Sequence, residues 1–326
     1  MDAEKFYVYL NLDAFPAAWA AYRGVMCSAA TVGTKGFRPF AYWPFGLLKR
    51  AANGDRLSLR RLEKELALEQ IRRAHYPEKV SRLHGIYLWK TRDDAIRGER
   101  WRLTEGQYFA QEQLVEVEFY YTNRTEADTQ WIDAHVLDDG YVLNRNDLSW
   151  AHKYWTGEGR NHEPHWEQIV EGRGLIRTTA LRQRALQRIE TDSPRLLGEA
   201  EIGRPAGELG SDLNVIAPFV VVDRPGILRA NYFVDARDDT PEFMTKLGQH
   251  IVSLPKQNVH RRALELLLPG IQYTADLRKE GFDFDLRLLS EEGRSQISYA
   301  VSPRDSFDWS SLRVASPPAD GTRASA

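Results

Sequence analysis

The pattern of hydrophobic and polar positions predicts a mixture of strands and helices. Alternation, or a dense run of aromatic and branched residues, predicts strands over residues 5–12 (KFYVYLNL), 114–121 (LVEVEFYY) and 165–177 (HWEQIVEGRGLIR). In the second of these, Val115, Val117 and Phe119 share the face opposite the glutamates. A shorter strand is expected through Tyr87, followed by a helix with Thr91 as its N-cap.

Helices are predicted where hydrophobic residues recur every three or four positions. Leu59, Leu62 and Leu66 form one stripe of a helix over residues 57–75, which Pro77 ends. Elsewhere, glycine, proline and aromatic residues together indicate an ordered loop, and an Asp-Gly pair between hydrophobic runs indicates a hairpin. We predict two further helices, at AHKYW (151–155) and TTALRQRALQRIE (178–190). The ordered loop is predicted over residues 20–53, and the hairpin at VLDDGYVL (136–143).

Changes in composition divide the chain into four parts. A stretch rich in Gly, Pro and acidic residues predicts a linker, and the C-terminal residues have the composition of a disordered tail. After the linker we predict a hairpin (NVIAPFVVV and ILRANYFV around DRPG), helices from Thr240-Pro241 and from Asn258, and a strand pair formed by FDFDLRLL and SQISYAV. The four parts are a first domain over 1–188, the linker over 189–213, a second, smaller α+β domain over 214–302 and the tail over 303–326.

Composition narrows the class of protein. The single cysteine, Cys27, excludes a disulfide framework and a cysteine-rich metal site. The N-terminus lacks a secretion-signal pattern, and no hydrophobic run approaches the roughly 20 residues that span a bilayer, so we expect a cytoplasmic protein with no membrane partner. Residues 1–102 contain 19 Lys and Arg against 11 Asp and Glu, a balance of +8, so the total of −2 leaves −10 for the rest. The basic part suits a dinucleotide or a nucleic acid, or is a solvated surface.

Glu167 is a charged residue that the strand pattern places among core positions. Trp166, Ile169 and Val170 surround it in the sequence, and burying an unpaired carboxylate costs several kcal/mol. It therefore needs a partner. A hydroxyl-bearing ligand would make it a functional residue, and an arginine at the edge of the core would make it a structural one.

Other candidate sites have simpler structural explanations. Pro164 prevents a regular helix that would place the neighbouring histidines on one face, so surface or capping roles are preferred for them and no metal is expected. The histidines and acids considered are His152, His162, Glu163, His165 and Glu167. No GxxxxGK[ST], GxGxxG or GxSxG motif is present, and Cys27 stands alone. Glu116 and Glu118 could form a catalytic pair, but they suit the solvent-facing side of a strand better.

Three segments resemble motifs of the poly-ADP-ribose polymerase and diphtheria-toxin branch of the ADP-ribosyltransferases. RLHGIYLWKTRDDA resembles the second motif, in which a G-I-Y-F strand runs into a small-residue turn and a helix. LVEVEF resembles the strand that follows, and HWEQIVEGRGLIR resembles the final motif, N-E-Y-I-V-Y-x-x-x-Q-I. The segments occur in the family's order over about residues 5–180. The resemblance implies an α+β fold with a split, mostly antiparallel sheet of ADP-ribosyltransferase type.

The resemblance also implies roles for individual residues. Tyr87 stacks on nicotinamide, with Trp155 or Trp89 as a further aromatic face. Glu167 is the catalytic glutamate and stabilises the ribosyl cation as nicotinamide leaves. Arg82 contacts the NAD diphosphate. The branch normally has a histidine on its first strand, and YVYLNLD lacks it. The remaining cofactor-binding positions are Gly85, Tyr9 as the counterpart of that histidine, and Asn11 as the next candidate.

A closer likeness is to an uncharacterised group of bacterial proteins, whose motifs read here IRRAHYP, SRLHGIY, AHKYWTG and EQIV. That match brings no established activity. The ADP-ribosyltransferase resemblance implies a glycosyltransferase that uses NAD to modify a macromolecular acceptor, protein or nucleic acid, or that hydrolyses NAD. Such bacterial domains serve as toxins, phage-defence factors or effectors delivered into another cell. The alternative is a catalytically inactive module of the same fold that binds NAD or nucleic acid.

Overall fold

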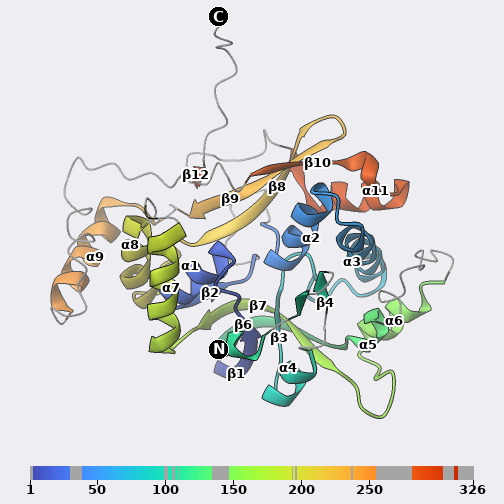
Figure 1. Ribbon diagram of the computed structural model, residues 1–326, viewed down its shortest axis with the longest axis horizontal. Coiled ribbons are helices and arrows are strands. Elements are labelled where there is room, and N and C mark those ends of the chain that lie inside the picture. The colour runs from blue at the N-terminus through green and yellow to red at the C-terminus, as the bar shows by residue number, and fades with distance from the viewer. Residues whose placement is uncertain are drawn as a thin grey trace, which may run out of the picture.

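The computed structural model has an α+β architecture with mostly antiparallel sheets (Figure 1), which confirms the predicted fold class at that level. It describes residues 3–29, 39–98, 102–104, 107–108, 110–133, 147–192, 194, 197–235, 238–254, 281–303 and 312–314. In these ranges no helix combines the length and the hydrophobicity needed to cross a membrane.

The first sheet is built on two long antiparallel strands, β6 (Leu114–Asp128) and β7 (Trp166–Leu175). Strand β1 (Ala3–Tyr9) pairs with β6 on the side away from β7. Strands β2 (Val25–Cys27) and β3 (Ile86–Leu88) pair with separate stretches of the other edge of β7. β7 therefore joins three other strands.

The alternating sequence of β6 explains its place in the sheet. Val115, Val117 and Phe119 are buried, as predicted. The strand continues beyond the predicted end because its second half, from Asn123 to Asp128, pairs with β7 after an irregularity in the register. Pairing with β7 thus extends a strand whose own hydrophobic alternation has already ended.

Helices α3 (Arg56–His75) and α6 (Ser149–Thr156) pack against each other and against the first sheet, with hydrophobic contacts to β6 and β7. Helix α3 confirms the predicted helix, and its N-cap Asp55 accepts hydrogen bonds from the backbone N–H groups of Leu57 and Ser58. Helix α6 confirms the helix predicted around AHKYW and ends at Gly157, whose φ of 74° is left-handed.

The second sheet has the strand order β10-β9-β8-β11, with β12 also paired to β9. Its strands are β8 (Ile216–Arg224), β9 (Ile227–Asp235), β10 (Phe282–Asp285), β11 (Ser302–Pro303) and β12 (Leu312–Val314). The predicted hairpin around DRPG is confirmed as β8 and β9. The predicted tail is corrected at β12, because backbone pairing with β9 orders this stretch as a strand.

The remaining elements complete the described fold. They are α1 (Phe15–Arg23), α2 (Tyr42–Ala52), α4 (Arg92–Gly98), α5 (Gln130–Asp133), α7 (Thr179–Asp192), α8 (Leu197–Glu208), α9 (Pro241–Ser253), α11 (Glu291–Ala300), β4 (Arg102–Thr104) and β5 (Gln107–Tyr108). The predicted helices after Thr91, over 178–190 and from Thr240 are confirmed as α4, α7 and α9. The hairpin predicted at 136–143 and the helix predicted from Asn258 lie outside the described residues.

Helix α2 corrects the prediction of an ordered loop over residues 20–53. Its proline, Pro44, lies in the first turn, where a missing N–H is tolerated, and Phe45, Leu47 and Leu48 are buried. The mixture of glycine, proline and aromatic residues indicated a loop, but burial in the tertiary structure stabilises a helix here.

Helix α8 lies within the predicted linker and packs against α1. Two of its glycines allow α8 to lie close to other neighbours: a Cβ on Gly203 would lie 3.2 Å from Cβ of Asn214, just before β8, and one on Gly207 would lie 3.2 Å from Cγ2 of Val25 in β2. The small residues that resemble a linker in the sequence are therefore packing positions, and the linker prediction is corrected at this helix.

Helix α11 corrects the prediction that SQISYAV forms a strand. Ser290 is its N-cap and accepts a hydrogen bond from the Gly293 N–H at 3.0 Å, while Glu291 and Glu292 favour the positive end of the helix dipole. Glu63 of α3 in turn accepts hydrogen bonds from the backbone N–H and the hydroxyl of Ser290.

Replacing Ser290 by alanine is expected to cost about 1 kcal/mol of unfolding free energy, because the hydroxyl caps α11. Urea denaturation measures the loss. Ser298→Ala is the control, because its hydroxyl donates to the Arg294 carbonyl within the helix. Equal stability of Ser290→Ala and the parent protein would contradict the capping role.

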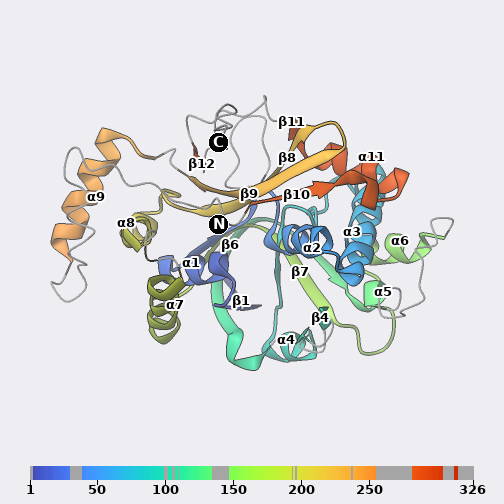
Figure 2. The same ribbon diagram turned by 45° about the horizontal axis from the view of Figure 1, so that its top comes forward.

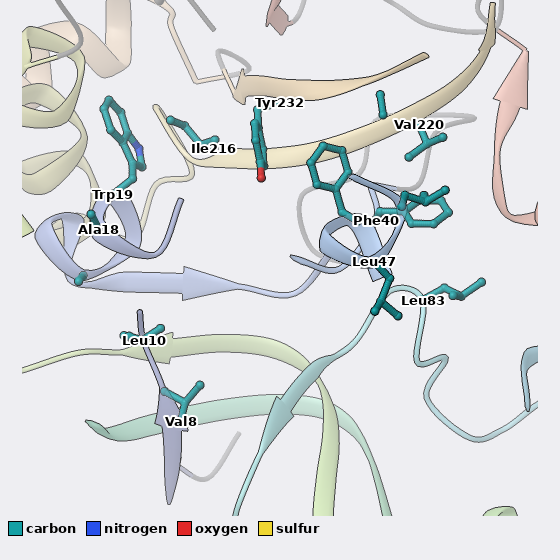
Figure 3. Close-up of a cluster of buried hydrophobic side chains, with 14 of the residues drawn as sticks. Val8, Leu10, Ala18, Trp19, Phe40, Leu47, Leu83, Ile216, Val220 and Tyr232 are labelled. Carbon is teal, nitrogen blue, oxygen red and sulfur yellow. The ribbon is translucent and has the colours of Figure 1, made fainter. Parts of the chain in front are cut away.

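One hydrophobic cluster joins both sheets (Figure 3). Trp19 and Phe40 belong to it, as do Ile216 and Tyr232 from the second sheet. Helix α2 lies between the sheets (Figure 2), and the ring centroids of Phe45 and Tyr232 are 4.8 Å apart. Residues on both sides of the predicted linker thus share a core.

Candidate functional site

Glu167, the second residue of β7, is buried with only 1% of its surface exposed. It pairs in register with Ala127 of β6, and its side chain meets groups from the turn before β3 and from α6. The sequence places hydrophobic residues beside it, so a carboxylate here requires protein or ligand partners.

Arg82 supplies the opposite charge and is itself 1% exposed. Its Nε and Nη2 groups donate to the two oxygens of Glu65 at 2.6 and 2.9 Å, a bidentate geometry that fixes the plane of the guanidinium. Its Nη1 group donates to Oε1 of Glu167 and to the hydroxyl of Tyr154, the latter at 2.5 Å. The arginine thus connects α3, α6 and β7.

Two tyrosines complete the arrangement. The Tyr154 hydroxyl donates to Oε1 of Glu167 at 2.5 Å. The centres of the Tyr87 and Tyr154 rings lie 4.7 and 5.3 Å from Cζ of Arg82, within the range of cation–π attraction. The Tyr87 hydroxyl donates to the Arg82 backbone carbonyl at 2.5 Å. We name Glu65, Arg82, Tyr87, Tyr154 and Glu167 the buried charge cluster.

The buried charge cluster holds two carboxylates and one guanidinium. Burial alone would lower the pKa of Arg82, but Glu167 and Glu65 outweigh it, so that pKa is raised and Arg82 stays charged. Burial raises the pKa of Glu167 above its usual value, although Arg82 and Tyr154 oppose the shift. Burial thus works against the charged form of Glu167, and Arg82 and Tyr154 favour that form.

The two oxygens of Glu167 differ in their surroundings. Oε1 accepts from both Arg82 and Tyr154, whereas Oε2 receives no hydrogen bond from the residues that the structure describes. One oxygen is thus held by the protein, and the other retains acceptor capacity for a ligand.

The turn that carries Arg82 is tightly packed. A Cβ on Gly85 would lie 2.5 Å from Cγ2 of Ile169 and 2.8 Å from Cγ1 of Val80. Ser81 donates to Glu69 at 2.9 Å, and Glu69 also binds Arg72. Gly85 therefore allows β3 to lie against β7.

Replacing Gly85 by alanine is expected to lower the unfolding free energy by about 1–3 kcal/mol, because the added methyl overpacks the turn against β7. Urea denaturation measures the change. Gly159→Ala is the control, since the nearest contact of its Cβ would be an ordinary 3.5 Å. Equal stability of the two variants would contradict the packing account.

The structure brings together Arg82, Tyr87 and Glu167 of the predicted site, but gives other predicted residues different surroundings. Tyr9 is buried, packs edge-on to Trp89 at 5.4 Å, and donates its hydroxyl to the Ala95 carbonyl at 2.9 Å. Tyr9 and Trp89 belong to a different hydrophobic cluster from Ile169 and Tyr154.

Asn11 and Trp155 also make local contacts. The Asn11 side chain accepts a hydrogen bond from the Asp13 N–H at 3.0 Å, as in an Asx turn. Trp155 is fully buried, donates from Nε1 to the Leu68 carbonyl at 2.9 Å and packs edge-on against Tyr154. Trp155 therefore supports α6 behind Tyr154.

Two members of the buried charge cluster were not predicted. Tyr154 lies beside Trp155 in the AHKYW motif, where the sequence analysis chose the tryptophan. Glu65 lies on α3, where a buried glutamate resembles the charged residues around it in sequence. A signal for Glu65 exists in its position between Leu62 and Leu66 of the hydrophobic stripe.

The other candidate groups have partners or surroundings that suit structural roles. Glu116 pairs with Lys5 at 3.0 Å on an exposed surface. Burial, followed by the neighbouring Asp212, raises the pKa of Cys27 to about 12, which disfavours the nucleophilic thiolate. Within the described ranges, no group of three or more His, Cys, Asp or Glu residues could hold a metal ion.

A family model described as a protein of unknown function (DUF2441) matches residues 51–179. This stretch contains every member of the buried charge cluster and excludes β1, β2 and the second sheet. No protein in the curated set matches the chain. The part of the chain with a recognisable family pattern is the part that builds the cluster.

Proposed function

We propose that this chain is an ADP-ribosyltransferase that transfers ADP-ribose from NAD to a macromolecular acceptor, protein or nucleic acid, or hydrolyses NAD. The observation that carries the proposal is a convergence in space. The segments SRLHGIY, AHKYWTG and EQIV are far apart in the chain, and each contributes a side chain to the buried charge cluster. In this proposal the protein acts as a bacterial toxin, effector or phage-defence factor.

The proposal includes a split sheet of ADP-ribosyltransferase type. Strands β2 and β3 pair with separate stretches of the same edge of β7. This arrangement supports a split sheet, because the sheet divides into two branches along that edge. Glu167 lies near the start of β7, one residue before the stretch that pairs with β3.

Glu167 would stabilise the positive charge that develops on the ribose. The bond between ribose C1′ and the nicotinamide nitrogen breaks, its electron pair leaves with nicotinamide, and a nucleophile of the acceptor or water bonds to C1′ and releases its proton to solvent. Glu167 Oε2 would accept a hydrogen bond from the ribose 2′-hydroxyl, while Tyr154 holds Oε1 in place. A carboxylate fixed in a buried site acts more strongly on such a charge than one in water.

Arg82 would have to change partners when NAD binds. Its guanidinium now faces the Tyr87 ring and donates to Glu167. In the proposed complex, Nη1 leaves Glu167 for a diphosphate oxygen, and Glu65 keeps its bidentate hold on the other two nitrogens. The half-buried ring of Tyr87 would stack on nicotinamide.

The inactive module is the second candidate, and Tyr9 favours it. The family's first-strand histidine is absent, and the Tyr9 hydroxyl that stands in its position is bonded to the Ala95 carbonyl. A protein of this kind would bind NAD or a nucleic acid without breaking the nicotinamide bond.

Incubating the full chain with NAD labelled on nicotinamide or on adenine, with and without cell extract, tests the proposal. We expect nicotinamide release and transfer of the adenine label to material that either protease or nuclease removes. Binding of intact NAD without release would identify the inactive module. Neither binding nor release would overturn the enzyme and the NAD-binding form of the inactive module.

A further inference from the structure

Two histidines outside the buried charge cluster lie side by side on neighbouring helices. His75 is the last residue of α3, and His152 lies in the middle of α6. Their ring centroids are 4.9 Å apart, and the ring planes are inclined by 56°. His75 is exposed and His152 half-buried, so solvent and dissolved ions reach the pair.

The ring nitrogens of this pair are mostly unused. Nδ1 of His152 shares a hydrogen bond of 3.2 Å with the Tyr76 hydroxyl. Among the described residues, the other nitrogen of His152 and both nitrogens of His75 make no hydrogen bond. A polar contact at one imidazole nitrogen with the other left open is the arrangement of a metal ligand supported by an outer partner.

The spacing of the rings fits one shared ion. Zinc binds an imidazole nitrogen at about 2.0–2.1 Å, so two rings on one ion near the tetrahedral angle have centroids about 5 Å apart. The observed 4.9 Å agrees with that distance. The ring planes are inclined and are not stacked in parallel.

The charges around the two histidines are compatible with a bound cation. The C-terminal end of α3, where His75 lies, is the negative end of its helix dipole. Of the neighbouring basic side chains, Arg72 is bound to Glu69, Arg73 lies over the Tyr299 ring at 4.0 Å, and Lys153 pairs with Glu158 at 3.4 Å.

We propose that His75 and His152 bind one divalent transition-metal ion of the zinc, nickel or copper class, through one nitrogen each. Water fills the remaining coordination positions, since the described residues offer no third His, Cys, Asp or Glu for the ion. Two imidazoles favour these metals over magnesium and calcium, which prefer oxygen ligands. The site is independent of the proposed activity.

Bound metal would join α3 to α6 at a second point. The helices already meet where Trp155 donates to the Leu68 carbonyl, and they carry Glu65 and Tyr154 of the buried charge cluster. A ligand that binds only the folded chain raises its melting temperature, and the stabilisation grows with the logarithm of the ligand concentration divided by Kd. The metal is therefore expected to stabilise the helix pair that holds the cluster.

Titration of the tag-free full chain with zinc chloride and with nickel chloride, followed by calorimetry and thermal melting, tests the site. We expect one ion per chain, a rise in melting temperature, and at least tenfold weaker binding in each of His75→Gln and His152→Gln. His162→Gln is the matched control, an exposed histidine outside the pair, and should bind like the parent protein.

Circular dichroism of each variant without metal establishes that it is folded. Failure of the parent protein to bind either metal would overturn the proposal. So would affinity that survives both substitutions, or an equal loss in His162→Gln. Because these measurements use no NAD, they are decided separately from the ADP-ribosyltransferase proposal.

Discussion

Replacing Glu167 by glutamine is expected to slow nicotinamide release from NAD by about 10²–10³-fold, the usual loss when one preorganised stabilising group is removed. Glutamine keeps the shape of the side chain and can still accept hydrogen bonds from Arg82 and Tyr154. It lacks the negative charge that would face the ribosyl cation, so the loss should fall on kcat more than on KM. Rates with labelled NAD measure both parameters.

Glu116→Gln is the control for this experiment. Glu116 lies on the neighbouring strand β6, where it pairs with Lys5 at the surface, and its loss should leave the rate unchanged. Equal rates for the parent protein and Glu167→Gln would refute the catalytic assignment. A loss shared by Glu116→Gln would indicate a general effect of charge instead.

Replacing Arg82 by methionine is expected to reduce the unfolding free energy by about 3–5 kcal/mol, because it leaves two buried carboxylates without their cation. Methionine retains hydrophobic bulk, so most of the effect comes from uncompensated charge. Chemical denaturation measures it. Arg82→Lys, which keeps a charge but not the bidentate geometry with Glu65, should lose less and serves if the methionine variant fails to fold.

Arg177→Met is the matched control, because Arg177 pairs with Glu118 at 2.6 Å on an exposed surface. Exposed ion pairs contribute at most about 1 kcal/mol. A similar small loss in Arg82→Met would contradict the buried-charge account. Adding Glu65→Gln and Glu167→Gln to Arg82→Met should recover part of the stability, since neutral amides would then replace the two buried carboxylates.

Local sequence patterns predicted those parts of the fold that local forces decide. The strand alternation of β6, the leucine stripe of α3 and the Thr240-Pro241 start of α9 all depend on neighbouring residues, and each is confirmed. Helices α2 and α8 were missed because their glycines and prolines lower helix propensity, while packing against distant elements stabilises them.

The sequence predicted that Glu167 is buried and needs a partner, but not which one. Periodicity identifies a carboxylate in a hydrophobic strand; it does not show that Arg82 and Tyr154 lie against it, because these contacts depend on how α6 and the turn before β3 fold onto β7. Of the two partners considered, the arginine is present. In the proposed function, a ribose hydroxyl is the second partner.

The position of β7 in the sequence determines when the first sheet can form during translation. Val25 of β2 pairs with Leu175, and Ile86 of β3 pairs with Val170, so both early strands are synthesised long before the strand that binds them. Until the ribosome has released β7, their edges are exposed to other chains, and contacts of such long range form slowly. The first sheet should therefore be completed only after residue 175 has left the exit tunnel, and until then its unpaired strands are expected to bind chaperones.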